Sequence, residues 1–219
     1  RSSRTDGSAK DEMSVVMSEL DGQANSDHAS CQPLEQFKGK YGRYLDIDDD
    51  GVPYRTIPGA HATHGAFVTR GSSRDEYAVY TEDGDAYRRN MDRLMRKWET
   101  AKKLVPAPKF FQESNQSEYG VIFFGTSTYA AKEAIELLGD KGIVLDAMRP
   151  KAFPFCDSFR EFVDSHEKVF VIEQNRDAQF KSLMTIELGT DPHKLVSVLN
   201  YDGTPITADN ILKQVSANI

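Results

Sequence analysis

The stretch YGVIFFGTSTYAAKEAIELLGDKGIVL, residues 119–145, decides the fold. Its apolar run at residues 121–124 predicts a buried strand that ends at Gly125. Residues 129–139 repeat apolar side chains with a helical period, and residues 143–145 predict a second strand. A strand that is apolar on both faces, followed by a helix and another strand, is typical of a parallel sheet covered on both sides.

The same alternation continues to the end of the sequence. Apolar runs predict further strands at residues 169–172 and 195–199. Helices are expected around residues 159–163 and 180–186, and over residues 207–216. Residues 109–219 are therefore predicted to form an α/β domain built on a parallel sheet.

A long amphipathic helix is predicted upstream, over residues 85–104. Its apolar side carries Tyr87, Met91, Leu94, Trp98 and Ala101, and Val105-Pro106-Ala107-Pro108 ends it. We place a domain boundary there. Its basic residues alternate with acidic ones, which indicates either a solvated helix face or a docking site for an acidic partner. The basic residues are Arg88, Arg89, Arg93, Arg96, Lys97, Lys102 and Lys103.

The first part of the sequence has few regular patterns. Residues 1–35 are rich in Ser, Asp, Glu and Gly, so we predict a linker or insertion that is partly disordered. Residues 36–84 carry frequent turn signals, such as Asp83-Gly84, with short extended pieces including residues 77–80. This loop-rich segment is expected to rest on a scaffold.

Composition excludes several classes of protein. The 219 residues have a net charge of −7, which argues against a nucleic-acid partner. No apolar run reaches the roughly 20 residues of a membrane span, so we expect no membrane partner and a soluble, cytoplasmic protein. Two cysteines, Cys31 and Cys156, are too few for an iron–sulfur cluster. Because the sequence begins at Arg1, we expect a fragment of a longer chain.

Three patterns in the loop-rich segment are candidate sites. Residues 46–51, DIDDDG, match the opening of a calcium-binding loop, but Ile57 stands where the bidentate Glu should be, so an acidic turn is favoured. His61 and His64 lack a third ligand at metal-site spacing, and no metal site is predicted. Arg55, beside a Pro-Gly turn, either binds a carboxylate or bonds to loop carbonyls.

Two polar clusters follow predicted strands of the α/β domain. Residues 125–128, GTST, stand where a strand gives way to a helix, and either bind an anion or cap the helix, which we favour. Glu173, Gln174 and Asn175 follow the third strand. Because ligands of open sheets bind at the carboxyl ends of the strands, these three either order neighbouring loops or form an interface with a partner or ligand.

Six segments together resemble the alpha subunit of the 2-oxoacid:ferredoxin oxidoreductases, most closely the 2-oxoglutarate type. They are GVPYRTIPGAHATHGAFVTRGSSRDEYAVYTEDG (51–84), RLMRKWETAKKLVP (93–106), YGVIFFGTSTYAAKEAI (119–135), LDAMRPKAFPF (145–155), VFVIEQNRDAQ (169–179) and NYDGTPIT (200–207). The resemblance implies that residues 36–105 are the C-terminal part of a pyrimidine-binding domain for thiamine diphosphate. Residues 109–219 would then be a domain of the transketolase C-terminal type.

The resemblance also implies a function for the complete enzyme. Such enzymes decarboxylate a 2-oxoacid with thiamine diphosphate and magnesium, pass electrons through iron–sulfur clusters to ferredoxin, and transfer the acyl group to coenzyme A. The partner is a beta subunit. Arg55 and the adjacent Thr56 are the expected substrate-binding residues. The chain alone should be inactive, with no cofactor bound and no catalytic residue of its own. The alternative is a non-catalytic assembly or regulatory module.

Overall fold

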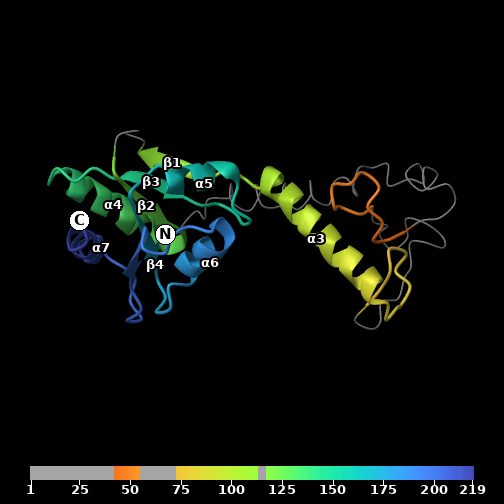
Figure 1. Cartoon of the computed structure of the whole chain (residues 1–219). Coiled ribbons are helices and arrows are strands. Elements are labelled where there is room, and N and C mark those ends of the chain that lie inside the picture. The colour runs from red at the N-terminus through yellow and green to blue at the C-terminus, as the bar shows by residue number, and fades with distance from the viewer. Residues whose placement is uncertain (1–41, 55–72, 113–116) are drawn as a thin grey trace, which may run out of the picture. The chain divides into compact units, whose positions relative to one another are not determined.

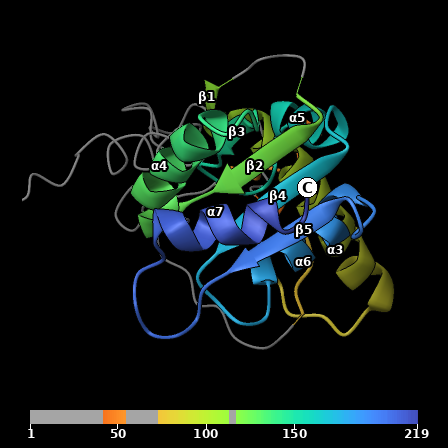
Figure 2. The same ribbon diagram turned by 90° about the vertical axis from the view of Figure 1, so that its left-hand side faces the viewer.

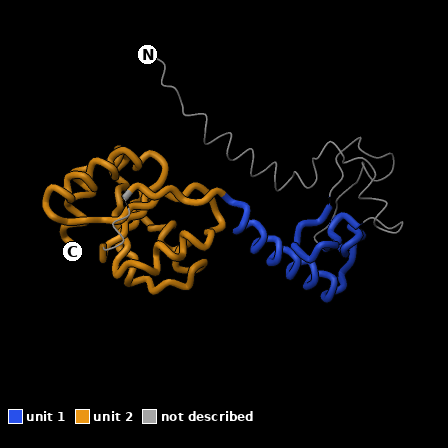
Figure 3. Tube along the Cα trace, turned by 90° about the horizontal axis from the view of Figure 1, so that it is seen from above, with its two compact units in different colours: residues 1–105 blue, residues 106–219 orange. Residues whose placement is uncertain are grey.

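The computed structural model describes residues 42–54, 73–112 and 117–219 of the chain (Figure 1). It contains two compact units, residues 1–105 and residues 106–219, coloured separately in Figure 3. The division falls within the Val105-Pro106-Ala107-Pro108 segment. The predicted linker at residues 1–35 lies outside the described residues.

The second unit is built on a five-stranded sheet with the strand order β1-β3-β2-β4-β5. Strands β2, β3, β4 and β5 run parallel to one another, while β1 pairs antiparallel with β3 at the edge. The predicted α/β class with a parallel sheet is confirmed, but the antiparallel edge strand was not expected. The strands are β1 Lys109–Gln112, β2 Tyr119–Phe123, β3 Asp146–Arg149, β4 Lys168–Glu173 and β5 Leu195–Leu199.

Helices cover both faces of this sheet (Figure 2). Helices α4 and α7 pack on one face, against side chains that include Phe123, Phe170 and Val198. Helices α5 and α6 pack on the other face, against alternate strand residues that include Ile122 and Val171. The core therefore consists of two apolar layers. The bounds are η1 Gly125–Ser127, α4 Thr128–Gly139, α5 Asp157–Asp164, α6 Gln179–Leu188 and α7 Ala208–Ser216.

Strand β3 begins one residue after the strand predicted at residues 143–145, so that prediction was wrong. The strand includes Asp146, a residue that an apolar pattern excludes. Asp146 is buried, and its Oδ2 lies 3.2 Å from Nε2 of the buried His166. A buried carboxylate is tolerated when it has such a partner. The pair explains how a charged residue occupies the sheet.

Helix α3, Gly84–Leu104, is the long helix of the first unit. The side chain of Asp83 accepts hydrogen bonds from the backbone N–H groups of Asp85 and Ala86 and so caps the helix, which ends before Val105. Residues 77–80 are not the extended piece expected, because Ala78 adopts a left-handed conformation within a turn. None of the described helices has a stretch apolar enough to cross a membrane.

Candidate functional site

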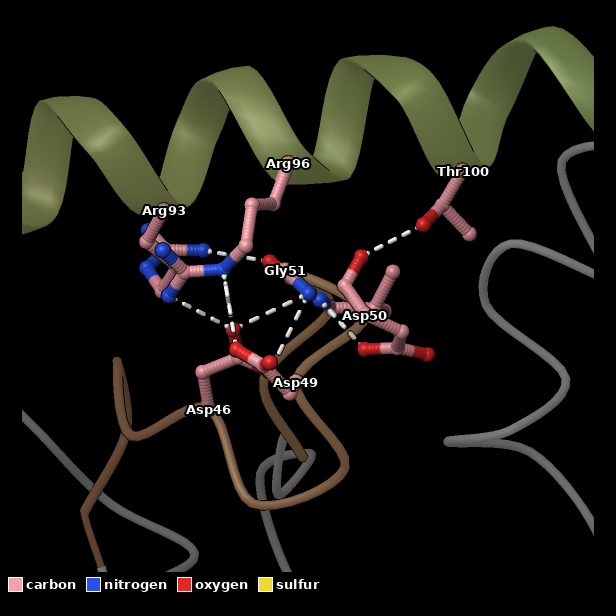
Figure 4. A network of polar contacts seen from close by, with 8 residues as sticks. Asp46, Asp49, Asp50, Gly51, Arg93, Arg96 and Thr100 are labelled. Atoms are coloured by element: carbon pink, nitrogen blue, oxygen red, sulfur yellow. Dashed lines mark hydrogen bonds and ion pairs between the residues drawn. The ribbon is translucent and has the colours of Figure 1, made fainter.

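Helix α3 binds the acidic loop at residues 46–51 through polar side chains (Figure 4). Nη1 of Arg93 donates to the carbonyl of Gly51 at 2.9 Å, and Oγ1 of Thr100 donates to the carbonyl of Asp50 at 2.5 Å. Arg93 is buried, whereas the basic residues of this helix were expected on a solvated face or at a docking site for an acidic partner. The side of α3 that faces this loop is therefore polar.

Asp46 organises the loop from within. Its two carboxylate oxygens accept hydrogen bonds from the backbone N–H of Gly51 at 3.0 and 3.1 Å. Oδ2 of Asp46 also accepts from Nη2 of Arg96 at 2.9 Å, and Nε of Arg96 lies 3.3 Å from Oδ1 of Asp49. A guanidinium thus pairs with Asp46, the first carboxylate that the calcium motif would present to an ion, and with Asp49, which is not a ligand position of that motif. Within residues 42–54, 73–112 and 117–219, no three metal-ligating side chains form a cluster that could hold a metal.

The same loop leads to the predicted substrate-binding residues. The hydroxyl of Tyr54 donates to Oδ2 of Asp48 at 2.7 Å, and this hydrogen bond to a carboxylate raises the pKa of Tyr54 above 10.0. Arg55 and Thr56 follow directly and lie outside the described residues. Their predicted role remains an expectation. The loop that precedes Arg55 is held to α3 by the hydrogen bonds to Asp50 and Gly51.

Helix α3 also binds residues 74–76. Nδ2 of Asn90 donates to the carbonyl of Arg74 at 2.6 Å. Nε of Arg89 donates to Oε1 of Glu76 at 2.5 Å, and this hydrogen bond holds the pKa of Glu76 below 4.5. Two basic residues of α3, Arg89 and Arg96, thus bind the carboxylates of Glu76 and Asp46 in the same unit.

The carboxyl ends of β2 and β4 meet at the point where the strand order reverses, since the chain passes from β2 to β3 on one side and from β4 to β5 on the other. Such a switch point is where open α/β sheets bind ligands. Here Nε2 of Gln174 donates to Oγ1 of Thr126 at 2.7 Å, and Oε1 of Gln174 accepts from the N–H of Ile206 at 3.1 Å. Gln174 therefore joins three loops of the same edge.

Glu173 is buried with both oxygens in use. Oε2 accepts from Nδ2 of Asn175 and from the N–H of Phe180, both at 2.7 Å, and Oε1 accepts from the N–H of Lys181 at 3.0 Å. The carboxylate thus satisfies donors at the N-terminus of α6. The observed contacts of Glu173, Gln174 and Asn175 order loops within the chain, and their predicted interface role remains a prediction.

The GTST segment does not cap its helix as favoured from sequence. The hydroxyl of Ser127 donates to the carbonyl of Phe124 at 2.6 Å, and that of Thr128 donates to the carbonyl of Gly125 at 2.7 Å. Neither η1 nor α4 has a side-chain cap. Ser127 and Thr128 lie inside the helical region, so their hydroxyl groups donate to carbonyls of the preceding turn and not to the helix N-terminus.

Sequence analysis missed the anchoring residues of α3. Asn90, Arg93, Lys97 and Thr100 also recur at three- and four-residue steps, so they form a polar stripe with helical period. Only the apolar side of the helix was identified from the sequence. The signal in the sequence is opposite charge: the stripe carries basic residues, and the loop at residues 46–51 is acidic.

The fold therefore places the second unit among α/β domains with a mostly parallel sheet, and comparisons with known proteins extend this result. The chain is 24% identical over 177 residues to the 2-oxoacid:ferredoxin oxidoreductase 2 subunit alpha of Aeropyrum pernix. It is 23% identical over 183 residues to the corresponding alpha subunit of Saccharolobus solfataricus. Each match covers 79% of this chain but only 26% and 27% of the relatives. No known protein-family profile matches.

A solved structure agrees with these relatives. The 2-oxoglutarate:ferredoxin oxidoreductase from Magnetococcus marinus, with 2-oxoglutarate, coenzyme A and succinyl-CoA bound, superposes with a TM-score of 0.70 at 20% identity. The match covers 82% of this chain and 31% of that one. The predicted resemblance is confirmed: over about four fifths of its length, the chain is similar to alpha subunits of 2-oxoacid:ferredoxin oxidoreductases. It spans about a quarter of the curated relatives.

Proposed function

We propose that the chain serves as the C-terminal portion of the alpha subunit of a cytoplasmic 2-oxoglutarate:ferredoxin oxidoreductase. The similarity to alpha subunits over 79% of the chain carries this proposal. In the assembled enzyme, thiamine diphosphate with magnesium would supply the decarboxylation chemistry, iron–sulfur clusters would pass two electrons to ferredoxin, and coenzyme A would accept the acyl group. The beta subunit is the proposed partner.

This chain would contribute binding and positioning. Arg55, with Thr56 beside it, is proposed to hold a carboxylate of the 2-oxoacid, because a guanidinium matches a carboxylate in charge and planar geometry. The bonding of residues 46–54 to α3 supports this role, since it holds the residue before Arg55. The described residues give the magnesium ion no cluster of ligands, so no cofactor step is assigned to them.

The proposal is tested on the assembled protein, purified anaerobically from its own cells through a tag at the C-terminus of the complete polypeptide. We expect bound thiamine diphosphate and a beta subunit, together with reduction of ferredoxin or a viologen dye that requires 2-oxoglutarate and coenzyme A. The 219-residue chain expressed alone should be inactive. An assembly with neither the cofactor nor 2-oxoacid-dependent reduction would disprove the proposal.

The role of Arg55 has its own test in the same assembly. Arg55→Ala should raise the KM for 2-oxoglutarate about tenfold or more, because a charge-assisted hydrogen bond is lost. The KM for a monocarboxylic 2-oxoacid should rise less, and Lys213→Ala, at an exposed residue of α7, serves as the control. Unchanged kinetics with Arg55→Ala would leave the alternative function, a non-catalytic assembly module, which the self-contained core of the second unit favours.

A further inference from the structure

A histidine and an aspartate are buried together at the amino ends of the parallel strands of the second unit. The side chains of His166 and Asp146 are 4% and 7% exposed. Asp146 begins β3, and His166 lies in the turn between α5 and β4. Both groups are titratable, so the number of protons that they hold together decides the charge that is buried at this edge of the sheet.

Close packing fixes the position of the His166 ring. Gly120 of β2 is the Cα partner of Asp146 across the β2–β3 pair. A Cβ at Gly120 would lie 3.1 Å from Cγ and from Nδ1 of His166, so the ring occupies the space that a larger residue would fill. The centroid of the Phe162 ring in α5 lies 4.5 Å from that of the imidazole. His166 is thus enclosed by β2, β3 and α5, and its hydrogen bonds are made within the protein.

Both ring nitrogens of His166 face oxygen atoms. Nδ1 lies 2.6 Å from the carbonyl oxygen of Phe162, and Nε2 lies 3.2 Å from Oδ2 of Asp146. A carbonyl oxygen only accepts hydrogen bonds, so Nδ1 carries a proton that it donates to Phe162. The second contact then requires another proton, either on Nε2 or on the carboxyl group, because otherwise two lone pairs would face each other. The pair therefore holds one proton more than a neutral histidine beside an ionised aspartate.

Ser165 offers the ring a different arrangement. Its Oγ lies 3.2 Å from Nδ1 of His166, and a hydroxyl can donate to an unprotonated ring nitrogen. The same hydroxyl donates to the carbonyl of Phe162 at 3.0 Å. An unprotonated Nδ1 would also turn its lone pair toward that carbonyl oxygen at 2.6 Å, which is repulsive. The observed distances therefore favour a protonated Nδ1.

The end of α5 favours a positive charge on this ring. Phe162 lies in the last turn of the helix, whose carbonyl groups lack partners within the helix and carry partial negative charge. Asp146 approaches the other side of the ring. An imidazolium between a helix C-terminus and a carboxylate is therefore stabilised from both sides.

Other charged residues of the elements around the pair do not bond to the ring. They are Glu118 before β2, Glu161 and Asp164 in α5, Glu167 and Lys168 at the start of β4, and Lys194 before β5. The four carboxylate residues are exposed. The two lysine Nζ atoms donate to backbone carbonyls of Asn218 and Asp164 at 2.8 and 2.9 Å. Among the described residues, Asp146 is therefore the ionisable side chain that bonds to His166.

We propose that His166 and Asp146 form a pH-sensitive lock, a proton-holding pair that fastens the end of α5 to β3. While the extra proton is present, the ring bonds to the last turn of α5 through Nδ1 and to β3 through Nε2. Loss of this proton as the pH rises leaves one ring nitrogen with a lone pair that faces a buried acceptor, which is unfavourable. The lock therefore stabilises the second unit at lower pH, and the stabilisation is lost as the pH rises. The inference concerns the second unit and does not depend on the proposed function.

NMR of the 219-residue chain, labelled with ¹⁵N-histidine and ¹³C-aspartate, counts the protons of the pair directly. The measurement is made at about pH 7.5, where a free histidine is largely neutral. We expect hydrogen on both ring nitrogens of His166, or hydrogen on Nδ1 together with a protonated Asp146 carboxyl. The ring signals are assigned through correlations to the backbone of His166, and the exposed His193 is the internal reference. A ring with one hydrogen beside an ionised Asp146 would overturn the inference.

Asp146→Asn removes the extra proton but can keep the hydrogen bond, because its amide nitrogen can donate to Nε2 of a neutral ring. The folding equilibrium constant of the unsubstituted chain, divided by that of this variant, should fall by up to about tenfold per pH unit between about pH 7 and 9. Urea unfolding followed by the methyl signals of Val169 and Val171 in β4 measures the second unit.

Asp209→Asn is the matched control, because Asp209 is an exposed residue of α7. Its ratio of folding constants should not change with pH. A ratio for Asp146→Asn that is equally constant would contradict the lock. Should Asp146→Asn fail to fold, the proton count on the unsubstituted chain decides the question.

Discussion

Individual buried polar residues hold the loops of this protein, and Glu173 is the clearest case. Its carboxylate accepts hydrogen bonds from the N–H groups of Phe180 and Lys181 at 2.7 and 3.0 Å. Glu173→Gln should reduce the local stability of this loop by about 1–3 kcal/mol. The substitution replaces one accepting carboxylate oxygen by an NH₂ group, which then faces the N–H donors of α6. Hydrogen exchange at the amides of Phe180 and Lys181 should accelerate, while Glu136→Gln, at an exposed residue of α4, should leave it unchanged. Equal exchange in both variants would contradict this account.

The pair of Glu76 and Arg89 gives a pH dependence of known sign. The pKa of Glu76 is lowered below 4.5 mainly by the hydrogen bond from Arg89, so the pair stabilises the folded state fully above pH 4.5. This contribution is lost as the pH falls through the lowered pKa, because protonation removes the charge. NMR titration of the Glu76 carboxyl should give a midpoint below 4.5 that returns toward 4.5 in Arg89→Gln. An identical midpoint in the two proteins would exclude the pair as the cause.

At the level of elements, sequence periodicity predicted most of the α/β unit. Strand β5 coincides with the predicted residues 195–199, and α4 begins one residue before the predicted helix. Prediction from periodicity failed where tertiary contacts override the apolar pattern. Strand β3 includes Asp146 because His166 pairs with it, and β1 is too short to give a periodic signal.

The candidate sites were only partly predictable. The sequence placed Thr126 and Gln174 at the same edge of the sheet, but the hydrogen bond that joins them depends on strand order. The polar contacts of α3 were not predicted, since hydrophobicity alone cannot detect that Arg93 and Thr100 bind backbone carbonyls of a distant loop. Arg55 was identified from its motif and lies outside the described residues.

The contact between the acidic loop and α3 can be tested at Gly51. Gly51 has φ +83°, and a Cβ there would lie 2.1 Å from the backbone N of Lys97. Gly51→Ala should therefore destabilise the loop–helix contact by more than about 1 kcal/mol. Urea unfolding followed by Trp98, the single tryptophan, reports on this unit. Gly84→Ala is the control, since nothing lies within 4 Å and α3 should tolerate it. Similar midpoints for both variants would refute the close contact.

At the scale of the whole molecule, the two units are stabilised by different interactions. Among the described residues of the first unit, Ala86 is the one buried hydrophobic residue, whereas the second unit contains two apolar layers. The described residues of the first unit are joined instead by hydrogen bonds and ion pairs of polar side chains, many of them exposed. Such pairs contribute little each, about 0–1 kcal/mol, while burial of a large apolar side chain contributes about 1.5–3 kcal/mol.

The isolated chain should consequently open in two stages. Amides of α3 should exchange with solvent faster than those of β2 and β4, because local opening of the first unit exposes little apolar surface. Strands β2 and β4 serve as internal references for the exchange of the α3 amides. Hydrogen exchange with mass spectrometry measures both. If α3 were as protected as β2 in the isolated chain, the two units would not differ in stability in the way that their described contacts indicate.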